Sequence, residues 1–275
     1  MVNKNKHLLG VAYNVFDGEE LLVYSIQQIK KYVDYIVVVA QEKSNFGNLN
    51  TNLRNKIKEL QDLGLIDLVH WYEPKFVYED NGTISLDNGV KNEQRKRQIG
   101  FDLCKEFGCT IFSSMDCDEI YDKEEYQFAK NDFVKGNYDS SFCQMKTFYK
   151  KPSFQVTPPE TYYVPLFYKV KENSNFTFDF VPPYPVEIDP SRRMKAGDCR
   201  IYTRNEIQMN HYSYVRSNIH SKINNSSSSS RISNLQKQQT INHFNNCKKV
   251  TDGAMFLNNR KFELIEVENK FNIEL

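Results

Sequence analysis

Short apolar runs alternate with amphipathic stretches through the first 115 residues of the chain. Runs that are mostly apolar and end at a glycine, an acid or an amide are typical of buried strands. They cover residues 8–15, 35–40, 66–71 and 110–115. The stretches between them repeat apolar residues at helical spacing, as Leu22, Ile26 and Ile29 do. These stretches cover residues 19–33, 52–63 and 91–107. The alternation predicts an α/β protein with a mostly parallel sheet and helices on both faces.

The second half of the chain has a different pattern. A helix is expected over 122–134, and the runs at 142–148, 162–170 and 200–202 predict strands of a smaller antiparallel region. Prolines interrupt the connections between them. A further helix is expected over 233–246 and a last strand over 261–267. No linker divides the chain, so we expect one domain over 1–275, built from a first half of about 1–121, a second half of about 122–232 and an extension of about 233–275.

Composition narrows the class of protein. The chain is 40% hydrophobic and 26% charged, as ordinary globular proteins are, and its formal net charge of +1 argues against a nucleic-acid-coating surface. Six scattered cysteines without a C-x-x-C pair argue against structural zinc and a disulfide framework. The first apolar run is too short for a signal peptide or a transmembrane segment. We therefore expect a cytoplasmic protein.

The strongest candidate for chemistry is the acidic end of the fourth predicted strand, Met115-Asp-Cys-Asp-Glu119. Asp116 and Asp118 are two positions apart at a strand end, where both carboxylates can converge on one hard cation such as Mg²⁺ or Mn²⁺. The alternative is a solvated turn, because so short a motif also occurs by chance. Cys117 between the two acids fits a small packed side chain better than a soft-metal ligand.

Basic residues could complete an anion site beside these acids. Lys91 and Arg95 share a helix face, with Asn92 and Arg97 nearby, and the alternative is a solvated helix surface. His211 is followed by Arg216, Lys222 and a serine-rich tract that ends in Arg231. Histidines next to tyrosines more often pack in a polar core than bind ligands. The basic sequel nevertheless predicts a flexible lid over 216–231 that closes on phosphates.

The order of these elements resembles the GT-A class of nucleotide-sugar glycosyltransferases, nearest to family-2-like members. The resemblance rests on the βαβαβ half, Lys91-Asn-Glu-Gln-Arg95, Asp116-Cys-Asp118 and His211-Tyr-Ser-Tyr-Val-Arg216, and it covers about residues 7–235. It implies transfer of a sugar, of the hexosyl or deoxyhexosyl kind, from a nucleotide-diphosphate donor to a carbohydrate or glycoconjugate acceptor. It also implies a Mn²⁺ or Mg²⁺ cofactor, a role in glycan synthesis, and neither a nucleic-acid partner nor a transmembrane segment.

The resemblance also assigns roles to residues. Asp118 would bind the metal directly, Asp116 would hold ribose or metal, and His211 would be a further ligand of the metal. Lys91, Arg95, Arg216 and Lys222 would contact the diphosphate. The nucleoside would lie against the ends of the first two strands, at Ala12, Tyr13, Asn14, Gln41 and Glu42. Many relatives carry an acid at the second strand's end and here only Glu42 is available, so the nucleotide's identity stays open.

An inverting transferase also needs a carboxylate that deprotonates the acceptor hydroxyl. Asp189 is the first candidate, followed by Glu187 and Asp179, although a loop acid beside Pro190 can also simply cap its own turn.

Two other functions fit parts of the pattern. A nucleotidyltransferase could use the same sheet and metal, but such enzymes usually carry a glycine-rich basic loop after the first strand, where this chain has Tyr13-Asn-Val-Phe-Asp-Gly18. A non-catalytic carbohydrate-binding protein could use the aromatic residues of the second half to stack on sugars, but it has no need of a metal-ready acid pair. These aromatic residues are Tyr149, Phe154, Tyr162, Tyr163, Phe167 and Tyr168.

Overall fold

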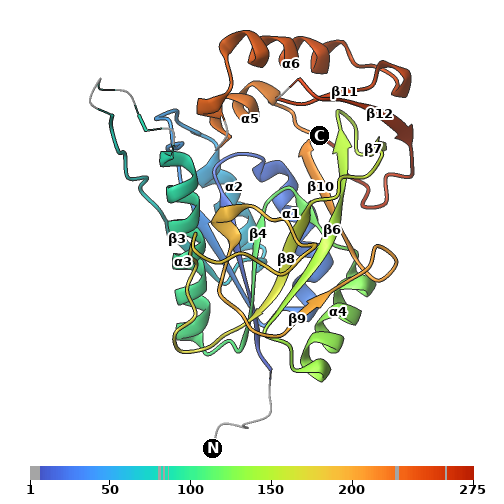
Figure 1. The fold of residues 1–275 in the computed structure, drawn as a ribbon. Helices are drawn as coiled ribbons and strands as arrows, with labels where there is room; N and C mark the ends of the chain where they lie inside the picture. The colour runs from blue at the N-terminus through green and yellow to red at the C-terminus, as the bar shows by residue number, and fades with distance from the viewer. Residues whose placement is uncertain (1–6, 80–81, 83, 86, 227–228, 258) are drawn as a thin grey trace, which may run out of the picture.

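A computed structural model describes residues 7–79, 82, 84–85, 87–226, 229–257 and 259–275 (Figure 1). In the parallel part of its sheet, β1 (Leu9–Val15) lies between β2 (Tyr35–Ala40) and β4 (Ile111–Asp116) and pairs in parallel with both. Beyond β2, the strand β3 (Leu68–Trp71) adds another parallel pair. The α/β class and the mostly parallel first half are therefore confirmed.

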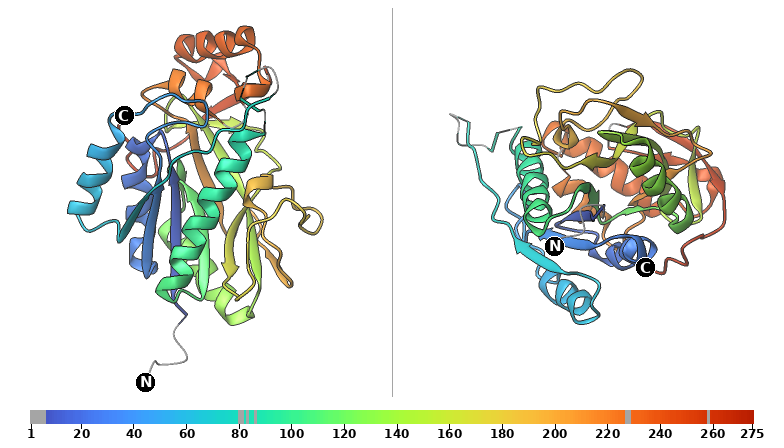
Figure 2. Two further views of the ribbon diagram at one scale, coloured as in Figure 1. Left: turned by 90° about the vertical axis from the view of Figure 1, so that its left-hand side faces the viewer. Right: turned by 90° about the horizontal axis from the view of Figure 1, so that it is seen from below.

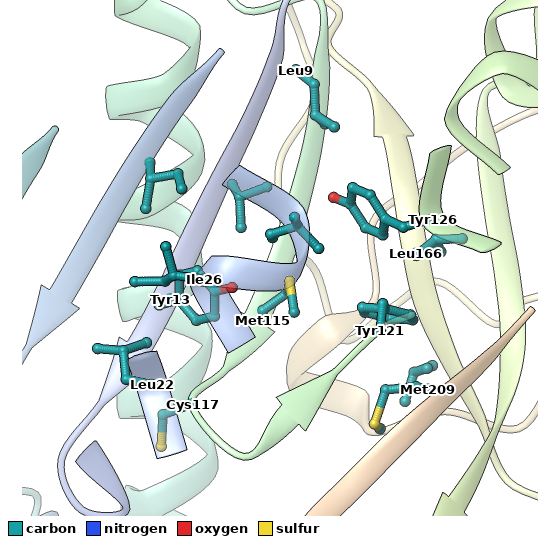
Figure 3. Close-up of a cluster of buried hydrophobic side chains, with 14 of the residues drawn as sticks. Leu9, Tyr13, Leu22, Ile26, Met115, Cys117, Tyr121, Tyr126, Leu166 and Met209 are labelled. Atoms are coloured by element: carbon teal, nitrogen blue, oxygen red, sulfur yellow. The ribbon is translucent and has the colours of Figure 1, made fainter. Parts of the chain in front are cut away.

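Helices cover both faces of this sheet, as the amphipathic stretches predict (Figure 2). Successive residues of β1 point to opposite faces, so Val11 and Tyr13 pack in one core cluster and Ala12 packs in another. The first cluster contains residues of α1 (Glu19–Ile29), α2 (Leu53–Asp62) and α4 (Lys123–Gly136). The second contains residues of α3 (Asn88–Phe107). Figure 3 shows the first cluster, where Leu22 and Ile26 of α1 lie near Tyr13 and Met115.

The helix α3 lies unusually close to β1. A Cβ atom at Gly100 would be only 2.5 Å from the Cβ atom of Ala12, so Gly100 is required where the helix crosses the strand. This close approach brings the N-terminal half of α3 to the carboxyl ends of the parallel strands, and it thereby positions polar helix residues beside the strand ends.

The second half extends the same sheet. The strand β8 (Tyr163–Lys169) pairs antiparallel with β4 and with β6 (Ser140–Tyr149), as expected. However, β9 (Cys199–Ile201) and β10 (Gln208–Tyr214) run parallel to β6. The remaining elements are β5 (Glu119–Ile120), β7 (Phe154–Thr157), α5 (Ile219–Asn225), α6 (Asn234–Asn246), β11 (Ala254–Met255) and β12 (Lys261–Glu266).

Several boundaries differ from the sequence-based expectation. The first helix ends at Ile29 and continues as a 3₁₀ turn, Lys30–Tyr32, after which Asp34 accepts a hydrogen bond from the Leu9 backbone at 2.9 Å and directs the chain into β2. The third helix starts at Asn88 instead of residue 91, and the Asn88 side chain accepts from the Val77 backbone at 3.0 Å. Strands β5, β7, β10 and β11 were not expected from the apolar pattern.

No helix among the residues that the structure describes is both long enough and apolar enough to cross a membrane.

Candidate functional site

A polar cavity of about 220 Å³ lies at the carboxyl ends of β1, β2 and β4. Parallel strands bring their ends to one edge of the sheet, and Asn14 at the end of β1 is in register with Asp116 at the end of β4. Segments of α3, of the loop before Pro190, of β10 and of α5 complete the walls. The lining residues are Asn14, Phe16, Asp17, Gln41, Asn45, Glu93, Lys96, Asp116, Cys117, Asp118, Asp189, His211, Ser213, Arg216, Lys222, Asn225 and Ser226.

At one end of this cavity, which we call the acid end, Asp116 is held by two arginines. Arg97 of α3 donates to both carboxylate oxygens at 3.1 and 3.2 Å, and Arg192 donates to Oδ2 at 2.6 Å. Arg192 also donates to the buried carboxylate of Glu119. Burial raises the pKa of Asp116, but the two guanidinium charges outweigh burial and hold that pKa well below its usual range. Asp116 is therefore a fixed anion.

Asp118, the second member of the acid end, faces a different set of basic side chains. Its Oδ2 accepts a hydrogen bond from Arg216 and lies 3.5 Å from Lys222 Nζ, and its Oδ1 lies 3.8 Å from His211 Nε2. Burial raises the pKa of Asp118, but the charges of Lys222 and Arg216, and that of His211 once it is protonated at low pH, lower it to about 2. The three residues predicted for the metal, Asp116, Asp118 and His211, thus reach one cavity.

Gly18 makes room for the Arg216 guanidinium. A Cβ atom at position 18 would lie 1.3 Å from Arg216 Nη1, and Gly18 also has a left-handed φ of 76°. The positive φ favours glycine at this position, and a side chain there would displace the guanidinium from its place. Gly18, which follows the first strand, thus leaves space for Arg216 from the second half of the chain. The sequence alone did not indicate this contact.

His211 comes to the acid end through β10, which pairs antiparallel with β5 and places His211 opposite Glu119. Burial lowers the pKa of His211, so its imidazole is neutral at pH 7, the form that binds metals. The described residues contain no group of three or more His, Cys, Asp or Glu side chains arranged around a common metal position. Asp118 and His211 are the two neighbouring side chains that could hold a hard cation, which would need further oxygen ligands from outside the protein.

Another part of the cavity wall, which we call the amide end, consists of Asn14, Gln41 and Asn45. Gln41 Nε2 donates to Asn45 Oδ1 at 3.4 Å, and Asn45 Nδ2 donates to the Gly89 carbonyl at 3.5 Å. Both side-chain amide atoms of Asn14 and the Oε1 atom of Gln41 are buried and have no hydrogen-bond partner in the described structure. The phenyl ring of Phe16 belongs to the same cavity wall.

Glu93 and Lys96 of α3, together with Asp189 before the 3₁₀ turn Pro190–Arg192, line another part of the cavity. Burial, together with the nearby charge of Asp189, raises the pKa of Glu93 to about 7. Burial also lowers the pKa of Lys96. Asp189 lines the cavity while its Oδ1 accepts a hydrogen bond from the Ser191 backbone at 2.7 Å, so it also caps its own turn. The sequence-based prediction missed Glu93 and Lys96 because it placed Lys91 and Arg95 on the ligand-facing side of this helix.

Several other predicted site residues lie outside the cavity lining. Ala12 and Tyr13 are in the core, where Tyr13 Oη bonds Ser25 at 2.9 Å. Glu42 forms a partly exposed ion pair with Arg54. Lys91 is exposed, and Arg95 donates to Asn92 at 3.4 Å. Glu187 and Asp179 are exposed in the proline-rich loop. The structure does not bring these residues to the acid end or to the amide end.

The segment predicted as a lid contains α5 and lies against loops of the first half. Ser221 Oγ donates to Asp17 at 3.1 Å, Asn225 accepts from Asn48 at 2.8 Å, and Arg231 pairs with Asp87 at 3.2 Å. Residues 227 and 228 of the serine tract are outside the described residues. Closure of this segment upon ligand binding stays a prediction.

No known protein family matches the chain by sequence. No curated protein matches it either. Among solved structures, it is similar to residues 1–349 of S. aureus TarS, with 13% identity, a TM-score of 0.44, and coverage of 75% of this chain and 60% of that chain. The same fragment in complex with UDP-GlcNAc gives 13% identity, a TM-score of 0.36, and coverage of 52% and 36%. A longer TarS structure gives 14% identity, a TM-score of 0.43, and coverage of 74% and 36%. The chain thus spans less than two thirds of these proteins, and its function rests on the geometry of the cavity.

Proposed function

We propose that this chain is a glycosyltransferase that moves a sugar from a nucleotide-diphosphate donor to a hydroxyl of a carbohydrate or glycoconjugate acceptor, using Mn²⁺ or Mg²⁺. The observation that carries the proposal is the environment of Asp118. Its buried carboxylate at a strand end faces Arg216, Lys222 and His211 within 3.8 Å. A metal–diphosphate group would need an anionic and a cationic side chain at one point. The carboxylate of Asp118 would hold the cation, and Arg216 and Lys222 would donate to the phosphate oxygens.

The roles of these residues follow from charge. A cation held by Asp118 and His211 would supply Lewis-acid stabilisation of the leaving nucleoside diphosphate. When Asp118 takes that partner, Arg216 and Lys222 become available to donate to phosphate oxygens. These donors stabilise the negative charge that grows as the bond between the sugar and the phosphate breaks. Asp116, fixed by two arginines, is a preformed acceptor for ribose or sugar hydroxyls.

The acceptor hydroxyl must lose a proton, and Asp189 is the proposed base. One of its oxygens is fixed by the Ser191 backbone, which orients the carboxylate that lines the cavity. Glu93 is a second candidate because its pKa of about 7 suits proton transfer near neutral pH. Glu187 and Asp179 do not line the cavity and are weaker candidates.

Substituting His211 tests the proposal at a residue whose loss spares the acid pair. The variant His211→Ala should lower Mn²⁺-dependent turnover of a sugar nucleotide by about 10- to 100-fold, because a metal site loses one of its two protein ligands. Its melting temperature should change little. His70→Ala, on the edge strand β3, is the matched control and should keep wild-type turnover. Equal turnover in His211→Ala and His70→Ala would refute the role of His211 as a metal ligand.

A further inference from the structure

The amide end of the cavity contains buried polar atoms that have no hydrogen-bond partner in the described structure. Asn14 is 7% exposed and Gln41 is 1% exposed, yet Asn14 Nδ2, Asn14 Oδ1 and Gln41 Oε1 have no partner in the described structure. A buried amide atom without a partner destabilises the folded protein, because it has lost its hydrogen bonds to water. Three such atoms in the wall of one cavity indicate a ligand that presents complementary donors and acceptors.

The side-chain orientation of Gln41 follows from a chain of hydrogen bonds that ends at a backbone carbonyl. The carbonyl of Gly89 can only accept, so the atom of Asn45 that faces it at 3.5 Å must be Nδ2. Asn45 Oδ1 then faces Gln41 at 3.4 Å, and only Nε2 of Gln41 can donate to it. Gln41 Oε1 is therefore the atom left free, and the amide end offers one donor group and two acceptors.

Asn14 and Gln41 can act on one ligand because they end neighbouring strands. Gln41 N donates to the Val15 carbonyl at 2.9 Å, which places Gln41 directly beside the end of β1. The acid end lies on the other side of Asn14, at β4. Because Asp118, Asn14 and Gln41 line one cavity, a nucleotide whose diphosphate binds at Asp118 can direct its base to the amide end. The ring of Phe16 belongs to the same wall.

The four bases differ in the hydrogen-bond donors and acceptors that they offer to the donor group and the two acceptors of the amide end. Asn14, with a donor beside an acceptor, can pair with the edge of any base, so it does not discriminate. Gln41 Oε1 requires one more donor. Guanine presents two adjacent donors, N1–H and the 2-amino group, beside the O6 acceptor. Uracil presents one donor between two acceptors, and adenine and cytosine present a single amino group.

We infer that the donor is a guanosine-diphosphate sugar, an inference that rests on the proposed function. Asn14 donates to O6 and accepts from N1–H, while Gln41 Oε1 accepts from the 2-amino group. The base thereby satisfies all three unpaired amide atoms, whereas uracil would place its second carbonyl against Gln41 Oε1 and leave that acceptor unpaired.

Titration calorimetry in the presence of Mn²⁺ tests the inference with GDP, IDP, UDP and ADP. IDP differs from GDP only in lacking the 2-amino group, so GDP should bind about tenfold more tightly than IDP, the effect of one hydrogen bond. The variant Gln41→Leu should bind GDP only as tightly as IDP, and its affinity for IDP should equal that of the wild type. Gln61→Leu, an exposed glutamine on α2, is the matched control and should keep the tenfold preference.

The outcomes separate the inference from the proposed function. Equal binding of GDP and IDP, or tighter binding of UDP or ADP than of GDP, overturns guanine recognition and leaves the glycosyltransferase proposal standing. Binding of no nucleoside diphosphate overturns the proposed function, and the inference falls with it. If Gln41→Leu does not fold, the comparison of GDP with IDP on the wild-type protein still decides the question.

Discussion

The acid end and the amide end of the cavity differ in whether their buried polar groups have partners within the protein. At the acid end, Asp116 and Asp118 each have cationic partners, and Arg192 joins Asp116 to Glu119. At the amide end, the amide of Asn14 and Oε1 of Gln41 have none in the described structure. A ligand must therefore replace existing ion pairs at the acid end, whereas it meets vacant donors and acceptors at the amide end. Substitutions at the two ends should therefore differ in how they change the unfolding free energy and the affinity for nucleotide.

The largest effect is expected for Asp118→Asn. The amide cannot neutralise a cation, so Mn²⁺-dependent nucleotide binding should fall by at least about 100-fold, the loss of a charged ligand. Arg216 keeps its bond to the Ser213 carbonyl and Asp17 at 3.8 Å, so the protein should stay folded. Titration calorimetry measures the affinity, with exposed Asp102→Asn as control. Unchanged affinity in Asp118→Asn would refute the assignment of Asp118 to the metal.

Arg192→Met tests the structural role of the acid end. It leaves Glu119 buried without its cation, and breaking such a pair costs about 3 to 5 kcal/mol of unfolding free energy. Chemical denaturation measures this loss. Arg200→Met is the control, because Arg200 is 25% exposed in its pairs with Asp132 and Glu206 and should lose less than about 1 kcal/mol. Similar losses in the two variants would contradict the contrast between buried and surface pairs.

Asn14→Leu should give the reverse result at the amide end. Removing two unpaired buried amide atoms at similar volume should raise the unfolding free energy by about 1 kcal/mol. Nucleotide affinity should fall about tenfold, because the ligand loses its hydrogen bonds. Denaturation and calorimetry on the same preparation check both quantities. A variant that loses stability would show that Asn14 is already satisfied in the free protein.

The smallest effect concerns pH. Because the folded protein raises the pKa of Glu93 from 4.5 to about 7, it holds this proton more tightly than the unfolded chain does. The group therefore lowers stability as pH rises from about 4.5 to 7, by on the order of 2 kcal/mol. Denaturation at pH 4.5 and 7.5 should show a smaller drop for Glu93→Gln than for wild type, while exposed Glu59→Gln should follow wild type. Equal drops in all three proteins would contradict the raised pKa.

The part of the fold that sequence predicts best is the parallel half. Its strands are buried on both faces and its helices on one, so the period of the apolar residues identifies each element. The same logic pointed to Asp116 and Asp118, because they lie at the end of a predicted strand, whereas Asn14 and Gln41 were named only through the family resemblance. The strand β10 was missed because both of its faces are buried, so polar residues such as Asn210 and Ser213 hide the alternation.

The rest of the site depends on contacts that local pattern does not encode. Spacing shows that Lys91 and Arg95 share a face of α3, but only packing against β1 at Gly100 decides that Glu93 and Lys96 face the cavity. Arg192 follows a proline-rich loop without periodicity, and it reaches Asp116 across 76 residues of chain. Tertiary contacts of this length leave no signal in a single sequence.

The central claim is that the acid end binds a diphosphate through a divalent cation. Thermal unfolding of the wild-type protein with GDP- and UDP-linked sugars, each with Mn²⁺ and with excess chelator, tests it most directly, since a ligand of the native state raises the melting temperature. The account predicts stabilisation by a sugar nucleotide with Mn²⁺ and its loss in chelator. Equal stabilisation in chelator, or none with any sugar nucleotide, would contradict it.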